Sequence, residues 1–108
     1  MLSYFALYVK DVEYHPDQEP TGLIVKGPGS RESLMYDHRA GGWRYRPDAV
    51  SQIMNSQSWD DRRRRIDRAQ AEQISMLISQ GTHPLPSEAE IEAIFAESHR
   101  RREQGTLP

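Results

Sequence analysis

Charged side chains gather in two stretches of the chain, and these hold the residues whose types and spacing point most directly to a function. The first stretch runs from Lys10 to Lys26 and has no lysine or arginine between its ends. It holds four carboxylates, Asp11, Glu13, Asp17 and Glu19. Because two prolines stiffen this stretch, its acids form a platform on which a cationic protein partner could dock. The alternative interpretation is an ordinary solvated loop.

The second stretch is basic and contains consecutive guanidinium groups. They belong to Arg62, Arg63, Arg64 and Arg65. Together with Trp43, Arg44 and Arg46 earlier in the chain, they could form a phosphate-binding surface with an aromatic platform, as a nucleic-acid-binding protein requires. Acidic residues stand on both sides of the run. The alternative is therefore a solvated face whose charges pair within the chain.

Residues for catalysis or metal binding do not form a recognisable pattern. None of the 4 histidines pairs with another at the spacing of a helical metal site. A hard-cation site would have to use Asp11, Glu13, His15 and Asp17, and a proline-bounded loop offers too few fixed oxygens for it. The chain has no cysteine and no Gly-x-Ser-x-Gly elbow. We therefore expect a protein that is not an enzyme and that uses neither a metal nor a cofactor.

The front half of the chain has the composition of a sheet. Most of its aromatic residues lie within the first 45 positions, and aromatic and β-branched side chains favour strands. We expect strands at 3–10, 23–26, 33–38 and 43–46, arranged as an antiparallel meander of three or four strands. The first segment is apolar on both faces, which favours an internal strand over an edge strand.

The back half has the composition of helices, rich in alanine, glutamine, glutamate and arginine. Pro47 suits the opening position of a helix over 47–55. The pair Ser87 and Glu90 forms a capping box that opens a helix over 88–102. We expect these helices, with one more between them, to cover one face of the sheet.

The segment 59–79 allows two interpretations. One is a continuous helix from Trp59. In the other, Asp67 caps a later helix over 68–79, with Gln70 in the reciprocal position of a capping box, and the arginine run is extended. We favour the second because the run offers no apolar face to a helix.

The sequence thus predicts an α+β fold in a single domain, 1–108, with a strand-rich part at 3–46, a helix-rich part at 47–102 and a loose tail at 103–108. The predicted core consists of apolar residues that recur at strand or helix spacing. They are Phe5, Leu7, Val9, Leu23, Val25, Leu34, Trp43, Val50, Ile53, Ile74, Leu77, Ile91, Ile94 and Phe95.

Length and composition narrow the class of protein. A chain of 108 residues, of which 36% are hydrophobic and 28% are charged, can form one small hydrophobic core with a strongly polar surface. Its net charge of −2 argues against bulk attraction to nucleic acid. With no secretion-signal pattern and no apolar run of about 20 residues, we expect a cytoplasmic protein without membrane contact.

In size and layout the chain resembles small bacterial accessory and immunity proteins, which are often compact α+β domains without catalytic motifs. No functional residue carries over from that resemblance. The leading hypothesis is a non-enzymatic binding protein that recognises one protein partner through its acidic stretch, for example as an immunity-type inhibitor or accessory subunit. The alternative is a nucleic-acid-associated accessory protein that uses the arginines. The identity of the partner and the oligomeric state stay open.

Overall fold

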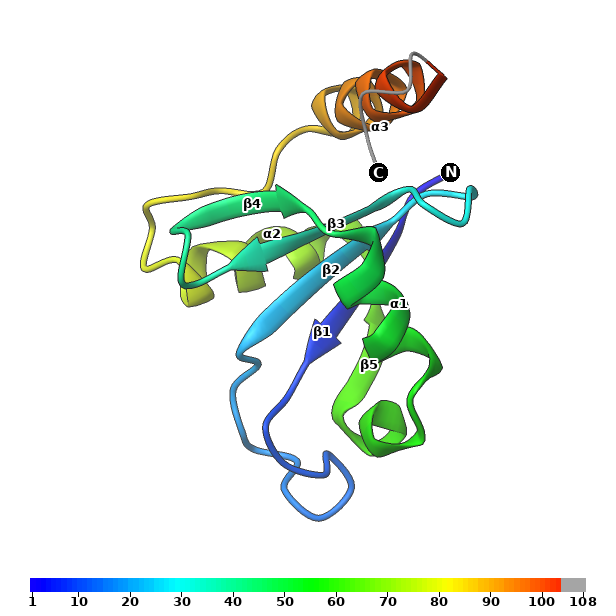
Figure 1. Ribbon diagram of the computed structural model, residues 1–108. Coiled ribbons are helices and arrows are strands. Elements are labelled where there is room, and N and C mark those ends of the chain that lie inside the picture. The colour runs from blue at the N-terminus through cyan, green and yellow to red at the C-terminus, as the bar shows by residue number, and fades with distance from the viewer. Residues whose placement is uncertain (104–108) are drawn as a thin grey trace.

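Five strands form one antiparallel sheet in this computed structural model, which describes residues 1–103 (Figure 1). The strands are β1 (Ser3–Leu7), β2 (Gly22–Lys26), β3 (Ser33–Asp37), β4 (Gly42–Tyr45) and β5 (Arg63–Ile66). Their order across the sheet is β4-β3-β2-β1-β5, so β1 is an internal strand, as its two apolar faces predicted. The predicted α+β fold is confirmed, with one strand more than expected.

The helical elements come after β4 in the chain, and β5 lies between the second and the third of them. They are α1 (Pro47–Asn55), the 3-10 helix η1 (Gln57–Arg62), α2 (Arg68–Ile78) and α3 (Glu88–Glu103). Pro47 opens α1 as expected. At the start of α3, the backbone N–H of Glu90 donates to Ser87 Oγ at 3.1 Å, and Ser87 N–H donates to Glu90 Oε1 at 3.2 Å. Of the predicted tail, residues 104–108 lie outside the described part of the chain.

Arg63, Arg64 and Arg65 are extended in β5, so the favoured interpretation of the segment 59–79 is confirmed for them, whereas Arg62 is the last residue of η1 and was wrongly expected to be extended. Asp67 begins α2 with a complete capping box. Its Oδ1 accepts from Gln70 N–H at 2.8 Å, and Gln70 Oε1 accepts from Asp67 N–H at 3.0 Å. Before it, β5 pairs with β1 in an antiparallel register that sets Phe5 opposite Arg65 and Leu7 opposite Arg63.

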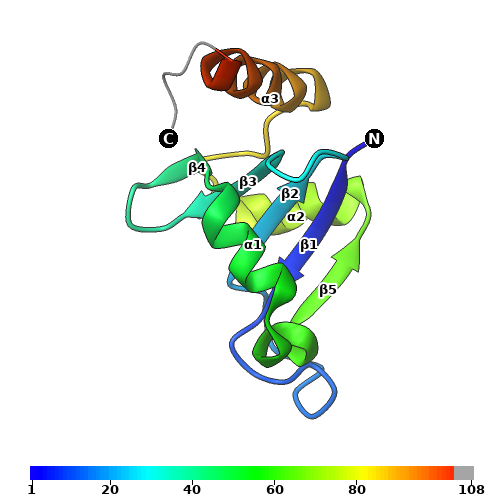
Figure 2. The ribbon, with the colours of Figure 1, turned by 45° about the vertical axis from the view of Figure 1, so that its right-hand side comes forward.

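Helices cover both faces of the sheet, not one as the sequence predicted (Figure 2). On the face of α2, buried Tyr4, Leu23 and Val25 pack with residues of α2 and α3. On the other face, Leu7 and Ile24 pack against Val50 of α1. The physical reason is the run of consecutive apolar residues in β2, because successive side chains of a strand point to opposite faces and both sets need cover.

Two residues of the predicted core are exposed. Val9 has 62% of its surface accessible because β1 ends at Leu7 and leaves Val9 in the following loop. Leu77 has 44% accessible on the outer side of α2. Conversely, several buried apolar residues were not predicted. These are Tyr4, Ala6, Ile24, Tyr36, Ala71 and Leu85.

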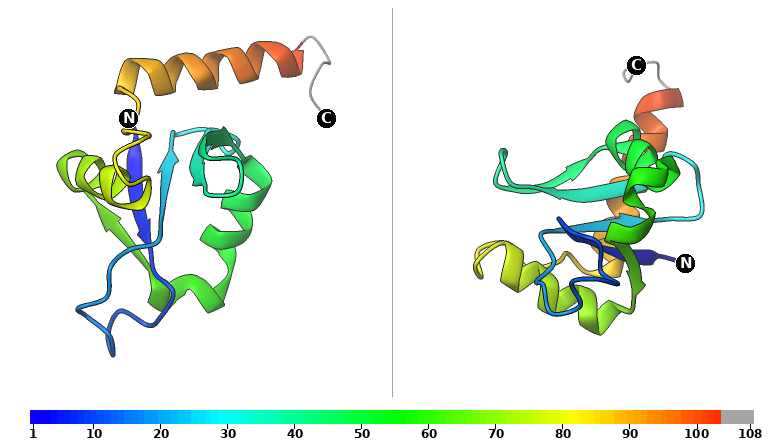
Figure 3. Two further views of the ribbon diagram at one scale, coloured as in Figure 1. Left: turned by 90° about the vertical axis from the view of Figure 1, so that its left-hand side faces the viewer. Right: turned by 90° about the horizontal axis from the view of Figure 1, so that it is seen from below.

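Helix α3 lies across one end of the sheet, beside the N-terminus (Figure 3). Its buried residues Ile91 and Phe95 reach the core on the α2 face. The segment before it is tied to β4, since the indole N–H of Trp43 donates to the backbone oxygen of Pro84 at 3.1 Å. The long loop between β1 and β2 projects from the opposite end of the sheet (Figure 3).

Candidate functional site

The loop that connects β1 to β2, residues 8–21, is named here the acidic loop. It carries all four acids that the sequence singled out, so the structure brings them together on one segment. Glu13, Asp17 and Glu19 are exposed, while Asp11 is half-buried. With Lys10 as the loop's one lysine or arginine, four carboxylates and one ammonium give a net charge of −3 when His15 is neutral.

Side-chain hydrogen bonds brace the acidic loop from within. The amide of Gln18 bridges the backbone of Lys10: its Oε1 accepts from Lys10 N–H at 3.1 Å, and its Nε2 donates to Lys10 O at 2.7 Å. Asp11 Oδ1 accepts from Glu13 N–H at 2.8 Å, which forms a tight turn after Lys10. The Gln18 side chain thus makes the two hydrogen bonds to Lys10 that a residue of a paired strand would make, and it connects the two ends of the loop.

Backbone hydrogen bonds also tie the acidic loop to η1. Tyr8 N–H donates to the oxygen of Arg62 at 2.8 Å, and Val12 N–H donates to the oxygen of Asp61 at 2.8 Å. These bonds continue the direction of the β1–β5 pairing beyond the end of β1. A loop held at its neck and along one side would lose less conformational entropy on binding than a free loop.

Two large apolar side chains are exposed on this acidic surface. Tyr14 has 78% and Val9 has 62% of its surface accessible. Both line a shallow hollow of about 340 Å³ together with Lys10, Asp17, Glu19 and their neighbours in the loop. Tyrosine is enriched at the energetic centres of protein interfaces, because it buries a large ring at a small entropic cost. Sequence reasoning missed Tyr14, although an aromatic residue in a proline-bounded loop was a usable sign.

The arginine run lies at the edge of the sheet and is engaged by its own chain. Arg63 Nη1 donates to the backbone oxygen of Ile53 at 2.8 Å, and its Nη2 lies 3.3 Å from Asp60 Oδ1. The guanidinium carbon of Arg62 lies 4.2 Å from the centre of the Trp59 ring. The Arg63 contacts hold α1 and η1 against β5, whereas the Arg62 contact lies within η1.

The remaining two arginines of the run are exposed but also bonded. Arg64 Nη1 donates to the backbone oxygen of Arg63 at 2.8 Å, and Arg65 Nη2 donates to Ser3 Oγ at 3.3 Å. Charged side chains on an edge strand discourage further strand pairing. The run is therefore explained by the fold without a ligand.

Arg44 and Arg46 are not brought to the arginine run. Arg44 lies in β4 and Arg46 directly follows it, at the opposite edge of the sheet from β5. Arg46 Nη2 lies 2.7 Å from Asp37 Oδ2, and Arg44 Nη1 donates to the oxygen of Trp43 at 2.9 Å. The guanidinium groups that the sequence assigned to one phosphate-binding surface thus form two separate sets.

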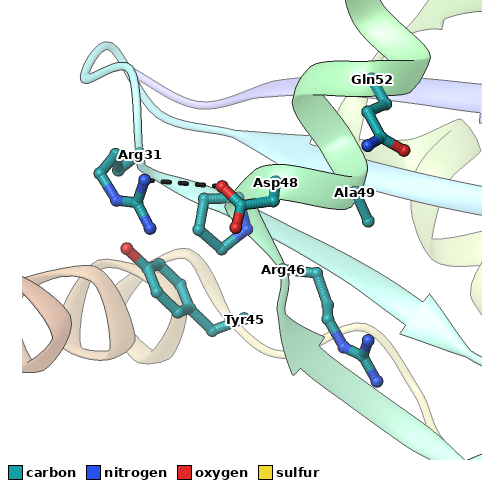
Figure 4. A pocket seen from close by; sticks show the side chains of 7 residues that line it. Arg31, Tyr45, Arg46, Asp48, Ala49 and Gln52 are labelled. Atoms are coloured by element: carbon teal, nitrogen blue, oxygen red, sulfur yellow. Dashed lines mark ion pairs between the residues drawn. The ribbon is translucent and has the colours of Figure 1, made fainter. Parts of the chain in front are cut away.

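A hollow of about 460 Å³ opens at the N-terminus of α1 (Figure 4). Arg31 and Tyr45 point toward each other across it, and Arg31 Nη1 lies 3.6 Å from Asp48 Oδ1. Arg46, also in its wall, is paired with Asp37. The positive charge that an anionic ligand would need here is already balanced by two acids of the chain.

Two histidines that are far apart in sequence meet at one aromatic residue. The ring centre of Tyr36 lies 4.9 Å from that of His38 and 6.1 Å from that of His83. His38 Nε2 hydrogen-bonds the oxygen of Thr21 at 2.7 Å, so the contact fastens the end of the acidic loop to β3. Within residues 1–103, no group of three or more histidine, aspartate or glutamate side chains could hold a metal ion.

No protein-family model, curated protein or solved structure matches the chain. None of the helices in the described part of the chain has the length and apolar character needed to cross a membrane. What the acidic loop does must therefore be argued from its own shape, charge and exposed side chains.

Proposed function

We propose that this protein is a small non-enzymatic binding protein that recognises one protein partner through the acidic loop. The observation that carries the proposal is the exposure of Tyr14, with 78% of its surface accessible, on a loop that is hydrogen-bonded at its neck and surrounded by carboxylates. A braced loop that presents an aromatic anchor within a charged rim has the anatomy of a protein-binding surface.

The negative charge of the acidic loop favours a basic partner. Glu13, Asp17 and Glu19 are exposed and lie in a stretch without an internal lysine or arginine other than the one at its neck. Complementary charge speeds association and excludes acidic proteins. In one concrete form, an immunity-type inhibitor in the cytoplasm, these carboxylates would meet the basic groups with which an enzyme holds an anionic substrate.

Affinity purification from the native cell tests the proposal. We expect a basic protein to co-purify in a fixed ratio with the tagged protein, and to be lost when Asp17 and Glu19 are both changed to lysine. A matched control changes Glu88 and Glu92 of α3 to lysine, which alters the net charge equally at the other end of the sheet (Figure 3). A partner retained by the loop variant would contradict the assignment of the acidic loop.

The alternative, a nucleic-acid-associated accessory protein, has less support. Its one favourable observation is that Arg64 and Arg65 are exposed at a sheet edge. Changing both to glutamine would reduce the slope of log affinity against log salt by about one unit for each phosphate that the protein no longer neutralises. The absence of any gel shift with DNA or RNA at low salt would remove this alternative.

A further inference from the structure

A third hollow lies between α2 and the two stems of the acidic loop, the residues where the loop leaves β1 and enters β2. It has a volume of about 260 Å³ and is named here the α2 groove. Tyr8 and Pro20 contribute to it from the loop stems, and Ile66, Ile74 and Leu77 contribute apolar side chains from the end of β5 and from α2. Two glutamine amides of α2 complete its wall. The groove is thus mainly apolar and open to solvent.

The apolar residues of α2 extend beyond the side that is buried against the sheet. Ala71 and Ser75 are buried toward the sheet. Ile74 packs against the core and also lines the groove, together with Leu77, which is its neighbour on the helix surface. Leu77 keeps 44% of its surface accessible there. The periodicity that predicted a core position for Leu77 is therefore real, but within the described residues that side of the helix is not covered.

The groove adjoins the shallow hollow of about 340 Å³ that Val9 and Tyr14 line, because both use residues from the stems of the loop. Tyr8 lines the groove and Val9 lines the hollow, while Pro20 lines the groove and Glu19 lines the hollow. Consecutive Cα atoms lie about 3.8 Å apart, so the residues that line the groove and the hollow are neighbours at both stems, and an extended segment of several residues is long enough to contact both. On β5, Arg64 Nη1 donates to the backbone oxygens of Asp60 and Arg63, so this guanidinium is held against its own strand but keeps its charge, and the four carboxylates of the acidic loop outnumber it.

We infer that the α2 groove holds an apolar side chain of the same basic protein segment that contacts the acidic loop. This inference rests on the proposed function and adds to it the chemistry of the bound segment. The segment is rich in lysine and arginine, and it carries a leucine- or phenylalanine-sized anchor beside its charges. The carboxylates of the acidic loop favour a basic segment, and the groove requires that its apolar side chain stand next to the basic residues.

Two synthetic peptides test the inference by chemical-shift mapping on the ¹⁵N-labelled protein. Both are rich in lysine and arginine and are identical, except that one has a central leucine where the other has serine. We expect both peptides to shift the amide signals of the acidic loop. Only the leucine peptide should also shift Gln73 and Leu77, and it should bind about tenfold more tightly, because it alone buries an apolar side chain.

Two neighbouring exposed residues of α2 supply matched variants. Leu77 lines the groove, whereas Met76, with 47% of its surface accessible, does not. Leu77→Asp should lower the affinity for the leucine peptide to that for the serine peptide, and Met76→Asp should leave it unchanged. Unchanged melting temperatures of both variants show that the fold is kept.

Three results would overturn the inference, and they are distinguishable. Equal affinities for the two peptides, with both shifting the acidic loop, would reject the groove and leave the loop as the binding surface. If neither peptide shifts the loop, the proposed function fails as well. Dimerisation of the unmodified protein that Leu77→Asp abolishes would assign the groove to a second copy of the chain.

Discussion

The Nη1 atom of Arg63 lies 2.8 Å from the backbone oxygen of Ile53, near the end of α1. Carbonyl groups in the last turn of a helix lack partners within the helix and carry partial negative charge, so a guanidinium group satisfies them well. The Arg63 side chain is only 18% accessible. One of the arginines that most suggested a ligand site therefore joins the edge strand β5 to a helix.

Arg63→Gln should destabilise the protein by about 1–3 kcal/mol, because a hydrogen bond from a charged donor is lost and a carbonyl group is left unsatisfied. Chemical denaturation measures the change in the free energy of unfolding. The control is Arg65→Gln, on the same strand but exposed, which should change that free energy by no more than about 0.5 kcal/mol. Equal effects of the two substitutions would show that Arg63 has no special role in the fold.

Removal of the Gln18 side chain should loosen the neck of the acidic loop. Gln18→Ala loses both hydrogen bonds to the backbone of Lys10, and we expect faster amide exchange at Lys10 with about 1 kcal/mol or less lost from global stability. Hydrogen exchange measured by NMR checks this. Exchange at Lys10 that stays as slow as in the unmodified protein would show that the brace is not needed to order the loop.

The contact between Glu32 and His99 should make stability depend on pH. Glu32 Oε1 accepts from Gly29 N–H at 2.8 Å, and its Oε2 lies 2.8 Å from His99 Nε2 of α3. The backbone hydrogen bond from Gly29, and then the hydrogen bond to His99, lower the pKa of Glu32 below its ordinary value of 4.5. The unfolded chain then binds a proton at higher pH than the folded one. The stabilisation is complete above the ordinary value and is lost as pH falls through the lowered pKa.

Denaturation of the unmodified protein and of Glu32→Gln between about pH 6 and about pH 3 checks this dependence. The difference in the free energy of unfolding between the two proteins should be largest at the upper end and should shrink as pH falls, because protonated Glu32 resembles glutamine. A difference that stays constant over this range would mean that the carboxylate charge does not contribute.

Phe95→Ala should cost about 3–5 kcal/mol, since Phe95 is 3% accessible and its removal leaves a cavity between α3 and the sheet. Thermal unfolding measures the loss. Met76→Ala, at an exposed position of α2, is the control and should leave the melting curve nearly unchanged. An unchanged melting curve for Phe95→Ala would show that α3 is not docked in solution.

Local features of the sequence predicted local structure well. The capping residues Asp67 and Ser87 placed the starts of α2 and α3, and Pro47 placed the start of α1. These predictions succeed because a cap is satisfied by groups within a few residues of itself. The α+β fold followed from these signs together with the aromatic and β-branched composition of the front half, but the strand β5 and the 3-10 helix η1 between α1 and α2 were not expected.

Features that depend on distant parts of the chain could not be predicted. The pairing of Phe5 with Arg65 in the sheet is set by tertiary packing, so the arginine run gave no sign of lying beside β1. The α2 groove could not be predicted either, since helical periodicity does not distinguish a buried apolar side chain from one that lines an open groove. The acids of the candidate site were found because they lie on one loop.

The association rate of the co-purified partner with the purified protein, measured across a range of salt concentrations, tests the central claim most directly. We predict that changing Asp17 and Glu19 to lysine slows association and flattens its dependence on salt, while the same change at Glu88 and Glu92 does neither. If both pairs of substitutions alter the rate equally, only the net charge of the protein matters, and the acidic loop is not the binding surface.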